Sequence, residues 1–475
     1  FKSHYNMRTF IKEKYLLLLF FLVLIVAANA QNFVVNSIVD AVDSNPGNGI
    51  CDDGFGNCPL RAAIQESNAL GGAHTITLPA GTITLSVAGI NEDASATGDL
   101  DIIADISIFG VSPTTSIISA DSLDRVFHVI SNGSLNLSLL SVTNGYVNLG
   151  NGGGILNSGD LDLSYVHIHN NIAELQLGAQ QAGGFGGGIA NFNTLTASNS
   201  TIFNNHAIGG KGSSSVFGGG GGGGSAGIGG GLFNGTIANS TLTNCTFSNN
   251  IARGGQGGGG SRWASGNLYG NGGNGAGQFG GNAGLANGGQ GQNATGFGGG
   301  GGGGASSRGD GGDGGFGGGA GCAGGHPFGF GAGTGNGTPG QFGGGVNTHC
   351  CDAGGGGGGG AGLGGGIFIL GGTCLTTNVT IAYNETYGGS GGFGHWQPNG
   401  QAGEGVGAGV FAFGGVLDIN NTLIANNVSE SSDNDAYGNI FSTTGYNLIF
   451  NIGSGVLSGN TTGNIIGQDP LISPL

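Results

Sequence analysis

A glycine-to-asparagine repeat that occurs five times restricts the fold of this chain more than any other feature. Each copy opens on a glycine triplet or near-triplet, continues as a short alternating run, and closes on an apolar residue with asparagine three positions later. The distances from the first glycine to the closing apolar residue are 16, 16, 18, 17 and 17 residues. Offsets this close predict a stack of similar units. The copies start at Gly152, Gly186, Gly229, Gly364 and Gly407.

The repeat predicts a solenoid of short strands. Leu161 and Leu163 show the period of two that directs alternate side chains inward. Glycine and asparagine tolerate the positive φ angles of tight corners. In stacked coils the closing asparagines lie about 4.8 Å apart and can bond along the stack as a ladder. These asparagines are Asn171, Asn205, Asn250, Asn384 and Asn427.

The fold class that satisfies these patterns is all-β, a right-handed parallel β-helix of the pectate-lyase-like type. A β-sandwich is the competing architecture, but it would lack the repeated glycine-to-asparagine frame. Glycine accounts for 116 of the 475 residues, and each interior glycine costs a helix about 1 kcal/mol relative to alanine. This composition excludes a compact helical protein, and the net charge of −16 argues against a nucleic-acid partner.

Composition shifts divide the chain into five parts, with glycine-rich segments interrupting the repeats. We expect these segments to leave from one edge of the solenoid, as repeat insertions do. They are either flexible or packed as extended glycine strands, and the sequence leaves both alternatives open. The parts are a signal peptide with an upstream extension (1–30), an N-terminal cap (31–90), coils (91–253) with a small insertion at 209–231, a glycine-rich insertion (254–363), and closing coils (364–475).

The N-terminus predicts export. Four cations within the first fourteen residues precede an apolar run, and Ala28-Asn29-Ala30 has the small-x-small pattern of a cleavage site. We expect no other transmembrane segment and a secreted or cell-surface location. Such a compartment permits disulfides, and Cys51 with Cys58 encloses a turn-rich stretch suited to a local bridge. The sequence does not give the pairing of Cys245, Cys322, Cys350, Cys351 and Cys374.

The N-terminal segment resembles a known module. Cys58-Pro59-Leu60-Arg61-Ala62-Ala63 resembles the CSLREA motif of bacterial surface proteins, although Pro59 and Ala62 depart from the Ser and Glu of that name. The glycine-to-asparagine repeats resemble the polymorphic-outer-membrane-protein β-helices. The resemblance implies a surface β-helix whose chain continues past Leu475 into a sorting or anchoring segment.

Candidate sites for chemistry are sparse in the sequence. A glycosidase needs two carboxylates across a cleft, and the candidate pairs Asp99/Asp101, Asp121/Asp124 and Asp433/Asp435 lie in turn-like stretches that favour capping. A calcium site near the cap is an open alternative, with candidate ligands Asp40, Asp43, Asp52 and Asp53. Their spacing fits no defined calcium loop. We therefore assign no catalytic, cofactor-binding or metal residues.

The predicted function is a non-enzymatic β-helix at the cell surface, an adhesin or scaffold that contacts extracellular glycans or a partner surface. The first alternative is a polysaccharide lyase or glycoside hydrolase with a degenerate site. The second alternative is an ice- or surface-binding protein, which would need a regular threonine array where these repeats mix Thr, Ser and Asn.

Overall fold

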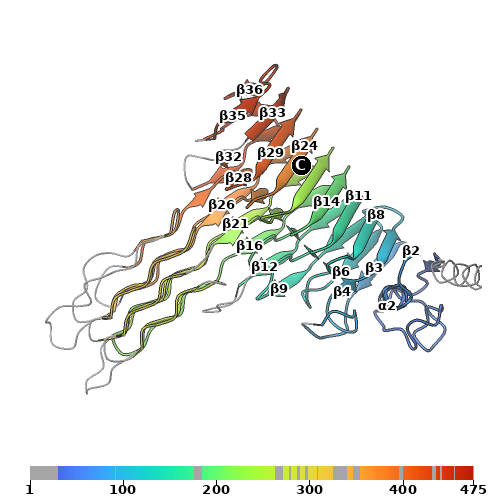
Figure 1. Ribbon diagram of the computed structural model, residues 1–475, viewed down its shortest axis with the longest axis horizontal. Coiled ribbons are helices and arrows are strands. Elements are labelled where there is room, and N and C mark those ends of the chain that lie inside the picture. Colours follow the sequence, from blue (N-terminus) through green and yellow to red (C-terminus); the bar gives the residue numbers. More distant parts are fainter. Residues whose placement is uncertain are drawn as a thin grey trace, which may run out of the picture.

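The chain is a right-handed parallel β-helix, which confirms the expected fold class (Figure 1). The expected signal peptide, Cys350, Cys351 and Asp433 lie outside the residues that the structure describes. Among the described residues, no helix has the length and hydropathy needed to cross a membrane. The computed structural model describes residues 30–90, 92–175, 184–262, 271–277, 280–285, 289–294, 298–306, 309–324, 340–345, 354–394, 399–430, 435–438, 441–453 and 455–473.

The coils stack strands into four sheets, of 19, eight, six and three strands. The first sheet holds β1 (Asn32–Val34), β2 (Ala73–Thr77), β3 (Gly81–Thr84), β5 (Asp105–Phe109), β6 (Ser116–Ser119), β8 (Ser134–Thr143), β11 (Asp160–His169), β14 (Thr194–Ser198), β15 (Thr201–Phe203), β19 (Asn239–Thr243), β20 (Thr246–Ser248), β24 (Thr373–Thr377), β25 (Thr380–Ala382), β29 (Val416–Asn420), β30 (Leu423–Ala425), β33 (Phe441–Gly445), β34 (Leu448–Ile449), β35 (Leu457–Gly459) and β36 (Ile465–Ile466).

The other three sheets form the remaining sides of the coils. The second sheet holds β4 (Leu100–Ile102), β7 (Phe127–Val129), β10 (Ile155–Asn157), β13 (Ile189–Asn191), β18 (Leu232–Asn234), β23 (Ile367–Ile369), β28 (Val410–Ala412) and β32 (Ala436–Gly438). The third holds β9 (Tyr146–Asn148), β12 (Ile172–Glu174), β16 (His206–Ile208), β21 (Ile251–Arg253), β26 (Glu385–Tyr387) and β31 (Val428–Ser429). The fourth holds β17 (Gly227–Ile228), β22 (Gly362–Leu363) and β27 (Gly405–Val406).

The repeat sets the register in which neighbouring coils stack. The closing apolar residues of the five copies pair directly with one another across β11, β15, β20, β25 and β30, and all are buried. One coil cannot bury its own apolar residues, but the stack forms a continuous core. The pairing joins Ile168, Ile202, Phe247, Ile381 and Ile424.

The asparagine that closes each repeat lies inside the solenoid and bonds to the next coil. Its Nδ2 donates to the next Oδ1 at 2.9, 3.0, 2.9 and 2.9 Å, from Asn171 through to Asn427. Each backbone N–H donates to the same oxygen. Asn427 donates to the Asp435 carboxylate at 2.8 Å, which ends the row. These amides are buried, so bonding along the stack satisfies groups that would otherwise destabilise the core.

A fully buried arginine fastens the N-terminal cap to the first coils. Arg61 lies on α2 (Leu60–Leu70), and its Nε donates to Asp40 Oδ1 at 2.7 Å. The rest of its guanidinium donates to Asp40 Oδ2 and to the carbonyls of Ser95, Gly98 and Asp99. A buried charge needs this complete set of partners. The Arg61 side chain therefore has a structural role.

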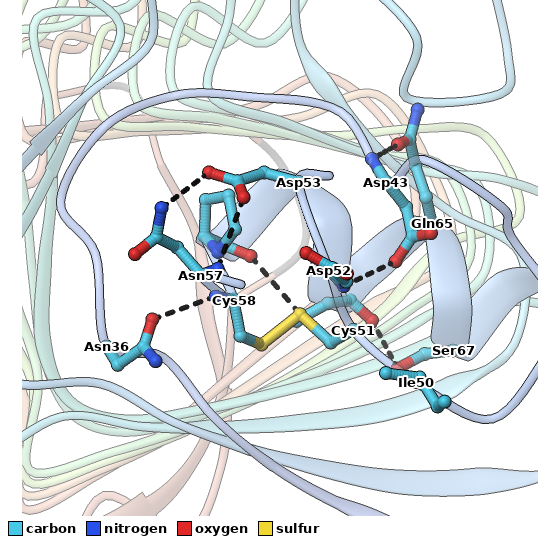
Figure 2. The surroundings of a disulfide bond; sticks show 12 residues. Asn36, Asp43, Ile50, Cys51, Asp52, Asp53, Asn57, Cys58, Gln65 and Ser67 are labelled. Carbon is cyan, nitrogen blue, oxygen red and sulfur yellow. Dashed lines mark hydrogen bonds between the residues drawn. A yellow bond between two sulfur atoms is a disulfide. The ribbon is translucent and has the colours of Figure 1, made fainter. Parts of the chain in front are cut away.

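Cys51 and Cys58 form a disulfide with an S–S distance of 2.03 Å (Figure 2). The enclosed turn is closed by Asp53, which accepts hydrogen bonds from the backbone and side-chain amides of Asn57. Cys245 and Cys374 are buried in the core, and burial raises the pKa of the Cys374 thiol to about 12. Cys322 is buried within the glycine-rich segments.

Three glycine-rich excursions leave the solenoid at one edge. They follow β16, β21 and β26 and return at β17, β22 and β27, which pair with one another. Figure 1 shows them running together away from the sheets. The third excursion, after Tyr387, lies within what the sequence indicated as closing coils. We call the described parts of 209–226, 254–361 and 388–404 the glycine bundle.

The central segment of the glycine bundle bonds to its neighbours with a period of three residues. Gly221, Gly224 and Gly227 donate to one neighbour, while Gly220 and Gly223 donate to another. A period of three is that of polyproline II helices, which have no internal hydrogen bonds and must bond outward. The segments bonded to residues 219–227 are 210–213, 255–261, 273–276, 298–304, 319–322 and 355–361.

Only glycine fits at the closest approaches in this packing. A Cβ on Gly221 would lie 1.9 Å from the Gly258 carbonyl oxygen, and one on Gly223 would lie 1.9 Å from that of Gly319. A Cβ on Gly259 would meet nothing closer than 3.4 Å, from the Ser214 side chain. Glycine here is thus required by the close approach of neighbouring backbones, with bonds that satisfy their polar groups.

We expect Gly221→Ala to disrupt the glycine bundle while the β-helix stays folded, because the added methyl group overlaps a neighbouring backbone. Limited proteolysis should show faster cleavage within residues 209–262, with the β-sheet circular dichroism retained. Gly259→Ala is the matched control and should be cleaved at the wild-type rate. Equal protection of both variants would contradict the packing.

We expect Asn250→Ala to lower the free energy of unfolding by about 3 kcal/mol, because it leaves buried hydrogen-bonding groups of Asn205 and Asn384 without partners. Denaturant unfolding followed by circular dichroism measures the change. Asn244→Gly is the comparison variant, because it removes an exposed side-chain amide that donates to Asn199, at a φ of 53° that glycine tolerates. It should lower the free energy of unfolding by less than about 1 kcal/mol. Equal losses would show that the internal ladder has no special role.

Candidate ligand-binding groove and acidic pocket

A groove crosses four coils on the outer face of the six-stranded sheet. Its floor is formed by Ile172, His206, Ile251 and Glu385, which pair in register across β12, β16, β21 and β26. Asn170, Asn204 and Asn249 form one wall, and the volume is about 520 Å³. The register explains the linear shape, because equivalent positions repeat once per coil.

The three wall asparagines have side-chain amides without a hydrogen-bond partner in the described protein. Each directly precedes an asparagine of the internal ladder and occupies a corner with a φ of 58°, 54° or 54°. The other exposed asparagine row differs, because its amides bond to one another from Asn199 through Asn421. The wall amides are therefore available to a ligand.

Burial lowers the pKa of His206, and the positive charge of Arg253 lowers it further, while Glu385 opposes the shift. The imidazole is consequently neutral near pH 7, with one ring nitrogen donating and the other accepting. Ile172 and Ile251 flank it with half-buried apolar surface. The floor thus combines apolar faces with a neutral hydrogen-bonding group.

Two tyrosines lie near the ends of the groove on the same sheet. The Tyr146 hydroxyl donates to Glu174 at 2.8 Å, and burial together with Glu174 raises the pKa of Tyr146 to about 12. The Tyr387 hydroxyl donates to Glu385 at 2.7 Å, while the Arg253 guanidinium lies 5.1 Å from the Tyr387 ring centroid. These contacts hold both rings and the guanidinium in place.

An acidic pocket of about 680 Å³ adjoins the groove toward the N-terminal cap. Arg125 Nη1 lies 3.1 Å from Asp99 Oδ2. Burial raises the pKa of Asp99 to about 8, with Arg125 opposing the shift and Asp124 and Asp101 reinforcing it. Perturbed groups that converge in a pocket are typical of functional sites. The lining includes Glu92, Asp93, Asp99, Asp124, Arg125, His128, Tyr146 and Asn148.

The structure places the candidate carboxylates differently from the turn caps that the sequence favoured. Asp99, Asp101 and Asp124 are buried at or beside the acidic pocket. Sequence reasoning missed the first member of the Asn-Asn doublet that ends four repeats, which is more exposed than the second. The pocket has no comparable signal, because its residues come from unlike coils.

The four candidate calcium ligands do not form a cation site. Asp40 pairs with Arg61, and Asp43 accepts hydrogen bonds from the backbone of Asn45 and Asp52. Asp52 accepts hydrogen bonds from the N–H groups of Gly54 and Gly56. Asp53 accepts them from Phe55 and from Asn57, the latter shown in Figure 2. Their oxygens satisfy local donors, so the calcium expectation near the cap is not supported.

Comparison with known proteins gives similarities of fold. No family model and no curated protein matches the chain. The pectate lyase Pel9A is 11% identical, with a TM-score of 0.36 over 92% of this chain and 80% of that one. The A-module of the Azotobacter vinelandii mannuronan C-5 epimerase AlgE4 is 13% identical, with a TM-score of 0.30 over 89% and 93%. ORF18 of Geobacillus virus E2 is 10% identical, with a TM-score of 0.21 over 91% and 60%.

These comparisons contradict the expectation that the chain is not an enzyme. The first two structures are a lyase and an epimerase, so proteins with this type of fold include enzymes. Identities of 11% and 13% with low TM-scores transfer neither activity to this chain. The lack of a recognisable catalytic motif in the sequence therefore does not exclude catalysis.

The lowered pKa of His206 predicts a pH dependence of stability. Below the unfolded-state pKa of about 6.5, the unfolded chain binds a proton that the folded chain does not bind until its own lower pKa is reached. The free energy of unfolding should therefore fall as the pH drops through this window, and less so in His206→Gln. Denaturant titrations from pH 8 to pH 5 test this, and parallel curves for the two proteins would contradict it.

Proposed function

We propose that this chain is an exported or cell-surface β-helix that binds an extended, neutral glycan along the groove, as an adhesin or extracellular scaffold does. The observation that carries the proposal is the row of free amides on Asn170, Asn204 and Asn249, one per coil.

The spacing of the row supports an extended ligand. Neighbouring strands of a parallel sheet lie about 4.8 Å apart, which is close to the length of one sugar unit in an extended chain. A glycan lying along the solenoid axis would meet one wall amide per sugar. Each amide supplies both donors and an acceptor, which suits ring hydroxyls.

The floor of the groove supports a saccharide rather than a peptide strand. Ile172 and Ile251 present apolar patches on which the C–H face of a sugar ring can lie, and neutral His206 both donates and accepts between them. The β-helix strands here are paired on both sides by neighbouring coils. They offer no open backbone edge for strand addition, which peptide recognition on sheets requires.

Electrostatics favours a neutral glycan. The net charge of −16 repels polyanions such as uronate polymers. Glu385 lies in the groove itself, with the Arg253 charge next to it over Tyr387. The disulfide between Cys51 and Cys58 is consistent with an oxidising, extracytoplasmic compartment.

Asn204→Gly should weaken binding to neutral polysaccharides about tenfold, because it removes the central wall amide while keeping a residue that tolerates a φ of 54°. Affinity electrophoresis against a panel of neutral and uronate polysaccharides identifies the ligand and measures the loss. Asn199→Gly is the matched control, with a φ of 50° at the preceding corner of the same coil, and should bind as wild type. Equal losses in both variants, preference for uronates, or no glycan binding by folded protein would overturn the proposal.

A further inference from the structure

The acidic pocket brings together three potential metal ligands from separate parts of the chain. Asp101 on β4 pairs in register with His128 on β7, and both project outward because their neighbours Leu100 and Phe127 fill the core. Asp93 comes from the preceding loop, which Glu92 orders by accepting hydrogen bonds from the backbone of Ala94 and Thr97. The three ligand atoms lie within 4.8 Å of one another.

The distances suit a small divalent cation. His128 Nδ1 lies 3.4 Å from Asp101 Oδ1 and 3.6 Å from Asp93 Oδ1. Two donors on a tetrahedral zinc ion, with bonds of about 2.0–2.2 Å, lie about 3.3–3.6 Å apart. The donor atoms are therefore already close to the separations that such an ion requires.

The burial and hydrogen bonding of the Asp101 carboxylate support a cation site independently of these distances. Its side chain is fully buried, and Oδ2 accepts a hydrogen bond from the Ser95 N–H at 2.9 Å. Oδ1 accepts no hydrogen bond although it is buried and faces His128 and Asp93. A buried carboxylate oxygen without a partner is costly. A cation at this position would give it one.

The nearby arginines bind other groups and do not contact Asp101 Oδ1. The Arg125 guanidinium is directed to Asp99 at 3.1 Å, and the next arginine of the cap, Arg61, is occupied by Asp40 and three carbonyls. The surrounding Glu92 and Asp124 add negative charge. The local field therefore attracts a cation rather than an anion.

We propose that Asp93, Asp101 and His128 form a binding site for a divalent cation of the zinc type. Two carboxylate oxygens and one imidazole nitrogen favour zinc over calcium or magnesium, which prefer oxygen ligands alone. Three protein ligands leave a fourth position that faces the pocket, where water or a ligand oxygen completes the coordination. The ion also ties the loop of Asp93 to the first coils.

The test is calorimetric titration of the untagged, metal-stripped full chain with Zn²⁺, supported by the visible absorption of a Co²⁺ complex. We expect one saturable site per chain, a tetrahedral Co²⁺ spectrum, and a higher melting temperature with Zn²⁺. His128→Ala and Asp93→Asn should each weaken the affinity at least tenfold and remove the thermal shift. Asp93 is 74% exposed, so its variant folds independently of any effect on the core.

His167→Ala and Asp162→Asn are the matched controls, because both side chains lie on the outer face of β11 away from the cluster. They should bind Zn²⁺ as wild type. Unchanged affinity in both cluster variants, equal weakening in the controls, or no saturable binding by folded protein would overturn the site. Binding of Ca²⁺ in preference to Zn²⁺ would overturn the donor argument.

Discussion

The structure depends on in-register stacking, in which the buried polar groups of each coil form hydrogen bonds with the next coil. The internal asparagine row shows this most directly, because each amide accepts two bonds from the coil before it and donates to the coil after it. A coil that slipped by one residue would turn these amides outward and the closing apolar residues away from the core. The spacing of coils is consequently uniform, and any side chain that repeats in the sequence becomes a row in space.

The polar groups of the glycine bundle must also find hydrogen-bond partners, but they do so with a different geometry. Its segments have few side chains to bury, so stability comes mainly from backbone groups that find hydrogen-bond partners on several sides at once. That arrangement needs many segments at one place, and the stacked coils supply them by releasing their excursions at the same edge. The solenoid therefore acts as a template for the bundle, and the long second excursion adds segments that bond to one another, as Gly301 bonds to Gly319.

The sequence predicted the structure of the repeated segments, but it did not predict contacts between segments that do not share the repeat. The offset between Gly152 and Ile168 recurs to within two residues in every copy, so strands, core and ladder followed from it. The packing around Gly221 could not be predicted, because the segments that surround it come from two excursions with no common frame. Arg61 was recognisable only as part of a motif, since its partner Asp40 is 21 residues away and its carbonyl partners are more than 30 away. Asp101 and His128 pair across two early coils that lack the repeat.

The same stacking rule connects the two candidate sites. Tyr146 lines the acidic pocket and pairs in register with Ile172, which lines the groove. The groove and the pocket thus meet where β9 and β12 pair on the third sheet, and the pocket continues onto the second sheet through His128. An extended ligand in the groove would present its end to the pocket, where the open coordination position of a cation would meet it. A rigid stack fixes the distance between the two, because no hinge separates β9 from β12 and their neighbours pair continuously.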